Sequence, residues 1–154
     1  MKLNIIKPIV ITVLFFVWQQ SMASETFFTA RCKTPFPESM SSLQEFIIKQ
    51  GYVISRVQHV DKGLKARGYD TGLYRIVFFG KKDEIHAIQN NYPALIPYIP
   101  LNITIFEDGT YTGISTIDPM SISNLYQSKK IKLITKLWHK DIFDIFNNYK
   151  HCSF

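Results

Sequence analysis

The sequence of 154 residues is poor in cysteine, with Cys32 and Cys152 as its two thiols. Two cysteines are too few for a disulfide-framework miniprotein and for a thiolate-rich zinc site. Charged residues make up 19% of the chain and aromatic residues 14%, which is not the composition of a disordered acidic or basic tail. A chain of this length with 46% apolar residues is expected to form one domain with a sizeable core.

Common catalytic signatures are also missing from the sequence. It contains no Gly-x-Ser-x-Gly motif, no Cys-x-x-Cys pair and no glycine-rich loop with the spacing of a phosphate cradle. The four histidines lack the i, i+4 spacing with a carboxylate that a helical metal site uses, so we predict no metal site and no cofactor. The tripeptide Asp70-Thr71-Gly72 matches the core of aspartic proteases, but it falls in an expected loop and we interpret it as a turn.

An apolar run near the amino terminus has the features of a targeting segment. Two lysines precede the run Ile9–Trp18, and small residues follow it up to Ala23. This order is typical of a secretory signal peptide. We therefore expect residues 1–23 to be removed by cleavage between Ala23 and Ser24, and the mature protein to be exported, either to a periplasm or out of the cell. The ten residues of this run would span only about 15 Å as a helix, half of a roughly 30 Å hydrocarbon layer, so we do not interpret it as a membrane anchor. We expect no transmembrane segment after signal removal.

Removal of the signal peptide lowers the net charge. The whole chain carries +6, and loss of the two lysines in residues 1–23 leaves +4. No basic stripe interleaved with aromatic residues is present, so nucleic acid is not an expected partner. Export would place Cys32 and Cys152 in an oxidising compartment, where an even count favours a disulfide bond; two free thiols are the alternative.

The pattern of apolar and turn residues predicts an α+β fold in a single domain, residues 24–154. Its two layers would be a mainly antiparallel sheet and helices on one face, because the elements do not alternate regularly as in a doubly wound sheet. Strands are expected at 26–33, 52–60, 74–79, 101–107 and 110–117, and helices at 36–50, 61–67, 81–91 and 129–149. Asp61 would cap the second helix, Asp108-Gly109 would form a type I′ hairpin turn, and the proline-rich stretch 93–100 would be an extended connector. Asp118-Pro119 is a helix-entry pattern.

The last predicted helix is amphipathic. At about 100° per residue its apolar positions fall in one stripe of roughly 80°, and they are Ile131, Ile134, Trp138, Ile142, Ile145 and Tyr149. Lysines project from the opposite side, namely Lys129, Lys132, Lys136 and Lys140. Two interpretations remain open for this side: a solvated helix face, or weak contact with an anionic surface, either phospholipid or an acidic partner.

Four stretches of the sequence, in this order, resemble the domain-of-unknown-function family 302. They are FPESMSSLQEFIIKQGY (36–52), VDKGLKARG (60–68), YRIVFFG (74–80) and IPLNITIFEDG (99–109), the last running on to Asp118-Pro119. The resemblance covers about residues 27–120, and the final helix is a looser match. The positions that match the family pattern are Gly51, Gly68, Tyr74, Pro100, Asp108 and Gly109.

The resemblance implies a two-layer α+β fold with an antiparallel sheet and a tendency to form homodimers, and it brings no established reaction. The sequence departs from the family pattern at two places where the family often has cysteine. It has Gly80-Lys81-Lys82 in place of Cys-Asn-Pro, and Ile99-Pro100-Leu101 in place of Leu-Pro-Cys. A thiol-based function is therefore not expected.

Two functional hypotheses follow. The first is a non-catalytic exported module that binds a small apolar ligand or a partner protein, in which tyrosines would converge on one concave pocket. The tyrosines considered are Tyr52, Tyr69, Tyr74, Tyr92 and Tyr98. The alternative is an enzyme with an uncommon site formed by His59, Asp61 and Lys65, which requires a cleft and a perturbed pKa.

Overall fold

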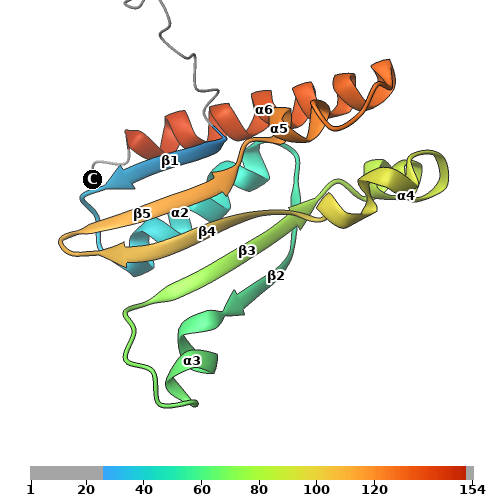
Figure 1. Cartoon of the computed structure of the whole chain (residues 1–154). Helices are drawn as coiled ribbons and strands as arrows, with labels where there is room; N and C mark the ends of the chain where they lie inside the picture. The colour runs from blue at the N-terminus through green and yellow to red at the C-terminus, as the bar shows by residue number, and fades with distance from the viewer. Residues whose placement is uncertain (1–25, 152–154) are drawn as a thin grey trace, which may run out of the picture.

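The computed structural model describes residues 26–151, in which a five-stranded sheet is covered on one face by helices (Figure 1). Every strand pairing is antiparallel, and the order across the sheet is β1-β5-β4-β3-β2. The strands are β1 (Phe27–Cys32), β2 (Val53–His59), β3 (Tyr74–Gly80), β4 (Leu101–Asp108) and β5 (Tyr111–Ile117). The predicted α+β class with a mainly antiparallel sheet is confirmed.

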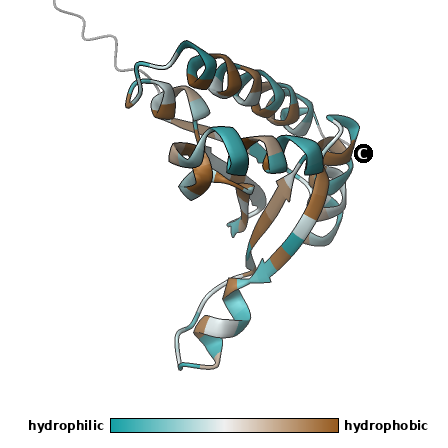
Figure 2. Cartoon of the chain, turned by 90° about the vertical axis from the view of Figure 1, so that its right-hand side faces the viewer, coloured by the Kyte–Doolittle hydropathy of each residue, from teal (hydrophilic) through white to brown (hydrophobic). Residues whose placement is uncertain are grey.

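The helices differ in where they lie on the sheet. The two long ones, α2 and α6, pack on the same face, whereas α3 lies at the end of β2 and α4 extends from the opposite end of the sheet (Figure 1). The helices are α2 (Phe36–Lys49), α3 (Val60–Lys65), α4 (Lys82–Asn91), η1 (Pro93–Tyr98), α5 (Pro119–Ser123) and α6 (Lys129–Lys150). Brown and teal alternate along the helices of Figure 2, as expected for helices with one buried side.

The core lies between this helical layer and the sheet. Leu43 and Ile47 of α2 are fully buried at the predicted helical spacing. They meet the alternate residues of the central strands that point the same way, among them Val77, Ile103 and Ile105. Burial of such side chains is the main favourable term in folding.

Helix α6 follows its predicted pattern. All six residues of the apolar stripe face inward; five are buried, and Ile134 is half-buried. The four predicted lysines are all exposed. The described helix ends one residue beyond the expected 129–149.

The opposite face of the sheet is not covered by a helix within residues 26–151. Tyr74, Ile76 and Phe78 of β3 lie on this open face and are half-buried. The Phe106 ring lies over Gly113 of the neighbouring strand, where an added Cβ would be only 2.7 Å from the ring. The ring thus covers a backbone position that lacks a side chain.

The hairpin between β4 and β5 differs by one residue from the prediction. Asp108 pairs with Tyr111, so the two loop residues are Gly109 and Thr110 rather than Asp108 and Gly109. Gly109 has a φ of 63° and no residue other than glycine has a positive φ in the described part. A single positive φ at the first loop position fits a type II′ turn, whereas the predicted type I′ turn needs two.

Two further local predictions were wrong. The stretch Pro93–Tyr98 forms the 3-10 helix η1 instead of an extended connector. Pro93 at its first position loses no intrahelical hydrogen bond, and Pro97 inside it lacks a donor for the Ala94 carbonyl, which accepts from Tyr126 OH at 3.0 Å instead. Asp61 lies inside α3, and the residue at the cap position is His59. Asp118 does cap α5 as predicted: its side chain accepts a hydrogen bond from the Met120 N–H at 2.8 Å.

Candidate functional site

A groove opens at the end of the sheet where β4 and β5 separate. Their pairing ends at Thr104 and Ser115, although β4 continues along β3 to Leu101 and β5 continues along β1 to Ile117. Extending the same register by four residues would set Pro100 opposite Pro119. Neither proline has an N–H to donate, so a ladder cannot close there.

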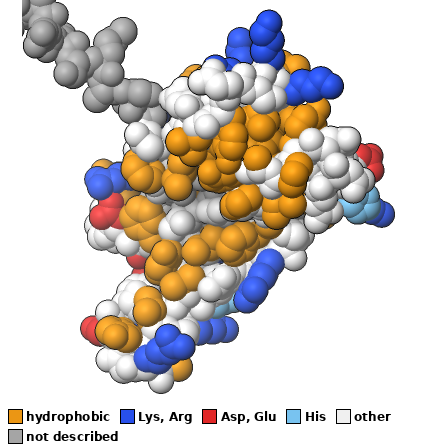
Figure 3. Space-filling view, turned by 45° about the vertical axis from the view of Figure 1, so that its right-hand side comes forward, with side chains coloured by type: hydrophobic (Ala, Val, Ile, Leu, Met, Phe, Trp, Pro, Cys, Tyr) orange, Lys and Arg blue, Asp and Glu red, His pale blue; other side chains and the backbone are white. Residues whose placement is uncertain are grey.

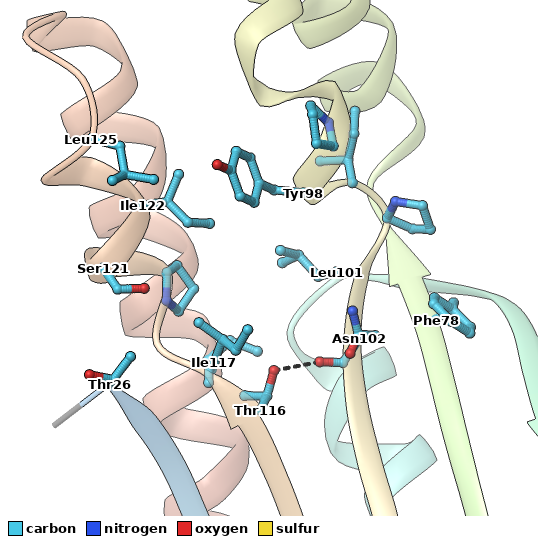
Figure 4. Close-up of a pocket in the computed structure, with 15 residues that line it drawn as sticks. Thr26, Phe78, Tyr98, Leu101, Asn102, Thr116, Ile117, Ser121, Ile122 and Leu125 are labelled. Carbon is cyan, nitrogen blue, oxygen red and sulfur yellow. Dashed lines mark hydrogen bonds between the residues drawn. The ribbon is translucent and has the colours of Figure 1, made fainter. Parts of the chain in front are cut away.

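The separated strands and the segments that flank them form the walls of this groove, which has a volume of about 620 Å³ (Figure 4). Ile122 and Leu125 lie on one side, and Tyr98 and Leu101 on the other. A broad apolar band is visible on this side of the molecule in Figure 3. The lining residues are Thr26, Phe78, Pro97, Tyr98, Ile99, Pro100, Leu101, Asn102, Thr116, Ile117, Pro119, Ser121, Ile122, Leu125 and Ile142.

The polar groups of the groove are few and uncharged. Thr116 Oγ1 donates to the Asn102 carbonyl at 2.6 Å, taking a place that a backbone N–H would fill in a continuous ladder (Figure 4). Ser121 Oγ donates to the Asp118 carbonyl at 2.6 Å. The lining contains no Lys, Arg, His, Asp or Glu side chain. Such a surface can accommodate an apolar group together with a neutral hydrogen-bonding group.

One wall of the groove, α5, is fixed by Asp118. Its Oδ1 lies 2.7 Å from His139 Nδ1 of α6 and also caps α5, while its N–H donates to the Thr26 carbonyl at 2.8 Å. The His139 ring packs against Phe28 of β1, with 5.2 Å between ring centroids. The sequence carries no sign of this pair, because its two members are 21 positions apart.

A second group of ionisable side chains joins the start of β2, the start of α4 and α6. Asp141 Oδ2 accepts hydrogen bonds from Tyr52 OH and from Lys81 Nζ, each at 2.9 Å. The Lys81 ammonium also lies 4.3 Å from the centroid of the Tyr52 ring. Burial, and then the hydrogen bond and charge of Asp141, raise the pKa of Tyr52 far above its usual value, so the phenol remains a neutral donor.

Glu84 belongs to the same group. Its Oε1 accepts a hydrogen bond from Trp138 Nε1 at 3.0 Å. Burial raises the pKa of Glu84, although the Trp138 hydrogen bond and the charge of Lys81 act in the opposite direction. These contacts hold α4 against α6, and none of these side chains lines the groove.

The candidate enzyme residues are distributed over two environments. His59 lines a hollow of about 240 Å³ beside α3, and Lys65 is exposed. Asp61 is 4% exposed, and its Oδ1 has no hydrogen-bond partner. Within the described residues, no side-chain hydrogen bond or ion pair joins any two of the three.

The six positions that match the family pattern have structural roles. Gly51 and Gly68 follow α2 and α3 with φ values of 79° and 84°. Tyr74 begins β3, Pro100 follows a cis peptide bond and lines the groove, and Asp108 forms an ion pair with Arg31 at 2.8 Å. Gly109 is the first residue of the hairpin loop.

The five tyrosines do not converge on one pocket. Tyr98 lines the groove and Tyr74 lines a smaller hollow on the open face. Tyr52 is buried, Tyr69 is 62% exposed and Tyr92 is half-buried. The groove was therefore not predictable from the tyrosines.

The cysteine and signal-peptide predictions concern both ends of the chain. Cys32 is buried at the end of β1, with its Sγ 3.0 Å from Thr34 Oγ1. Cys152, residues 1–23 and the predicted cleavage site between Ala23 and Ser24 lie outside the described residues. The disulfide and the cleavage remain predictions.

Neither a metal site nor a membrane span is found in the described part of the chain. Within residues 26–151, no three His, Cys, Asp or Glu side chains are placed to share a metal ion. The helices of this part are too short or too polar to cross a bilayer.

Comparisons with known proteins identify a family and a fold. The model of a family described as "Domain of unknown function DUF302" matches residues 28–147. The chain is also similar to the crystal structure of an uncharacterized conserved DUF302 protein from Bacillus stearothermophilus, with a TM-score of 0.74 and 16% sequence identity. That similarity covers 81% of this chain and 98% of the other. A search of curated proteins gave no match.

Proposed function

We propose that this chain, which belongs to the DUF302 family, is an exported, non-catalytic module that binds a small amphipathic ligand in the groove between α5 and η1. The apolar lining of the groove carries the proposal. Its volume of about 620 Å³ falls within the roughly 300–1,000 Å³ of small-molecule sites.

The exposure of the groove residues supports binding. Leu125 is 67% exposed and Ile117 is 56% exposed, although both border a concave surface. An apolar ligand that covers them would remove this area from water, which is favourable at roughly 25 cal/mol per Å².

The chemistry of the lining defines the ligand class. Because the lining has no ionisable side chain other than Tyr98, the inserted part of the ligand is uncharged. Asn102 and Ser121 offer hydrogen bonds to one neutral polar group. The ligand is therefore an apolar body that carries a neutral polar group, and any charged group would remain outside.

A neutral fluorescent probe, N-phenyl-1-naphthylamine, tests the proposal. We expect saturable binding to the mature protein and a loss of at least tenfold in affinity for Leu125→Trp, which fills the groove. Ile48→Trp is the matched control, because Ile48 is 58% exposed on α2 and outside the groove. Absence of probe binding, or equal affinity of the two variants, would contradict groove binding.

The described residues also support the proposed disulfide between Cys32 and Cys152. Tyr149 of α6 donates to the Thr112 carbonyl at 3.2 Å, and Thr112 is the β5 partner of Cys32. Cys152 follows Tyr149 by three positions, a separation short enough to support pairing with Cys32.

Native mass spectrometry of the protein taken from its export compartment tests the remaining predictions together. We expect a chain that begins at Ser24, a mass two hydrogens below that of the dithiol form, and a retained small molecule. The same spectrum reports whether the homodimer expected from the family resemblance forms. An intact Met1 would contradict export, and alkylation of both cysteines without prior reduction would contradict the disulfide.

A further inference from the structure

The outward side of the first half of α6 is strongly basic. Five lysines are exposed there and no acidic residue occurs between positions 129 and 140. They are Lys129, Lys130, Lys132, Lys136 and Lys140. Lys140 pairs with Asp144 at 2.9 Å, and the other four have no ion pair within the described residues. Four positive charges are therefore free to meet an external anion.

Two leucines lie among these lysines. Leu133 is 59% exposed and Leu137 is 52% exposed, one helical turn apart. At about 100° per residue, both point away from the buried stripe and fall between lysines on either side. The α6 helix cannot rotate to bury them, because its opposite side holds Trp138 and Ile142 in the core.

We propose that this surface, formed by the five lysines together with Leu133 and Leu137, docks on an anionic phospholipid bilayer. Exposed apolar side chains flanked by lysines supply the two kinds of contact, apolar and electrostatic, by which interfacial helices bind anionic membranes. Leucines can enter the boundary between headgroups and acyl chains, while lysine stems lie along it and keep their ammonium groups at the phosphates. A soluble anion would engage the lysines but give the two leucines no apolar partner, which favours a lipid surface.

Docking would place the groove beside the membrane. Leu125 lines the groove and lies four residues before the start of α6. In Figure 3, basic side chains stand above the apolar band that includes this region. The docking surface does not depend on the groove; if the proposed function holds, an amphipathic ligand could pass between the bilayer and the groove without crossing much water.

Sedimentation with vesicles tests the docking surface in the mature protein. We expect binding to phosphatidylcholine vesicles that contain phosphatidylglycerol, weaker binding as salt increases, and little binding to phosphatidylcholine alone. Each lysine near an anionic surface contributes about fivefold in affinity, so Lys132→Glu with Lys136→Glu should lower it by at least about 25-fold. Leu133→Ser with Leu137→Ser should weaken it at unchanged net charge.

Lys62→Glu with Arg67→Glu is the matched control. Both residues are exposed near α3, far along the sheet from α6, and the double reversal changes the net charge by the same amount. It should leave binding within about twofold of the wild type. An equal loss in this control would contradict a localised surface.

Other results of these experiments would identify a soluble anion or an acidic partner, instead of a bilayer, as the occupant of the docking surface. Release by inorganic phosphate at constant ionic strength would overturn the lipid assignment in favour of a soluble anion. Full vesicle binding by the leucine variant would also overturn it, because binding would then need the lysines alone. Binding to polyglutamate without binding to vesicles would overturn it in favour of an acidic partner. Probe binding in the groove with no vesicle binding would refute docking and leave the proposed function intact.

Discussion

The contact between Tyr52 and Asp141 gives the sharpest test of the structure, because it joins two residues 89 positions apart. The phenol is 2% exposed and donates to Asp141 Oδ2 at 2.9 Å, and Lys81 Nζ donates to the same oxygen. Tyr52→Phe keeps the ring and its edge-to-face contact with Phe79, at 5.1 Å between centroids. It removes only the hydrogen bond.

The expected loss in the free energy of unfolding depends on which polar groups each variant leaves without a partner. A hydrogen bond to a charged acceptor contributes about 1.5–3 kcal/mol, and Lys81 remains to pair with Asp141, so Tyr52→Phe should lower the free energy of unfolding by about 1.5 kcal/mol. Asp141→Ala leaves a buried phenol without an acceptor and should cost about 2–3 kcal/mol. The double variant should cost no more than Asp141→Ala, because it removes the unpaired phenol, which gives a coupling energy of at least about 1.5 kcal/mol.

Urea denaturation measures all four proteins. Trp138 is buried and provides a fluorescence signal, and far-UV circular dichroism checks that the transition is two-state. Additive single effects, with a coupling energy near zero, would refute the contact.

Three further predictions concern stability. Burial raises the pKa of Glu84, so the stability that its protonated form contributes is fully present below the unfolded-state pKa of about 4.3 and is lost as pH rises through the folded-state pKa. Glu84→Gln keeps an oxygen for Trp138, so its melting temperature should rise relative to that of the wild type as pH increases above about 4. A difference that does not change with pH would contradict this. Leu43→Ala should lower the free energy of unfolding by about 2–5 kcal/mol in urea titrations, because Leu43 is 0% exposed; a loss below about 1 kcal/mol would contradict its central position. Reduction should destabilise the mature protein by up to about 4–5 kcal/mol if Cys32 and Cys152 pair, and a Cys32→Ser/Cys152→Ser variant should be insensitive to the reductant.

The sheet and the long helices were predictable because their signals are local. The α6 stripe depends only on the spacing of apolar residues within one helix, and helical geometry converts that spacing directly into a buried face. The hairpin was located correctly, but its turn was displaced by one residue. Asp-Gly is a common pair of loop residues, which led to the prediction of Asp108-Gly109. The pairing of Asp108 with Tyr111 makes Gly109 and Thr110 the loop residues instead.

The contacts between distant segments were not predictable. Lys81 and Asp141 are 60 residues apart, and nothing in the spacing of either residue marks the other. The same holds for His139 and Asp118, of which the sequence marks only Asp118, as a helix-entry residue. Both pairs form because α6 packs against β1, α2 and α5, which brings its side chains to segments that are distant in the sequence.

The groove had a sequence signal of a different kind, which periodicity does not detect. Pro100 and Pro119 lie at equal distances from the centre of the hairpin loop at Gly109-Thr110, so the pairing register sets them opposite each other. A proline at one position would remove one ladder hydrogen bond, and two facing prolines remove both hydrogen bonds of their pair. The ladder therefore cannot continue through this pair. The strands have already separated beyond Thr104 and Ser115, and Ile117 and Leu125 beside the gap are exposed. The two prolines therefore mark the end of the hairpin where a binding groove should be sought, independently of any catalytic motif.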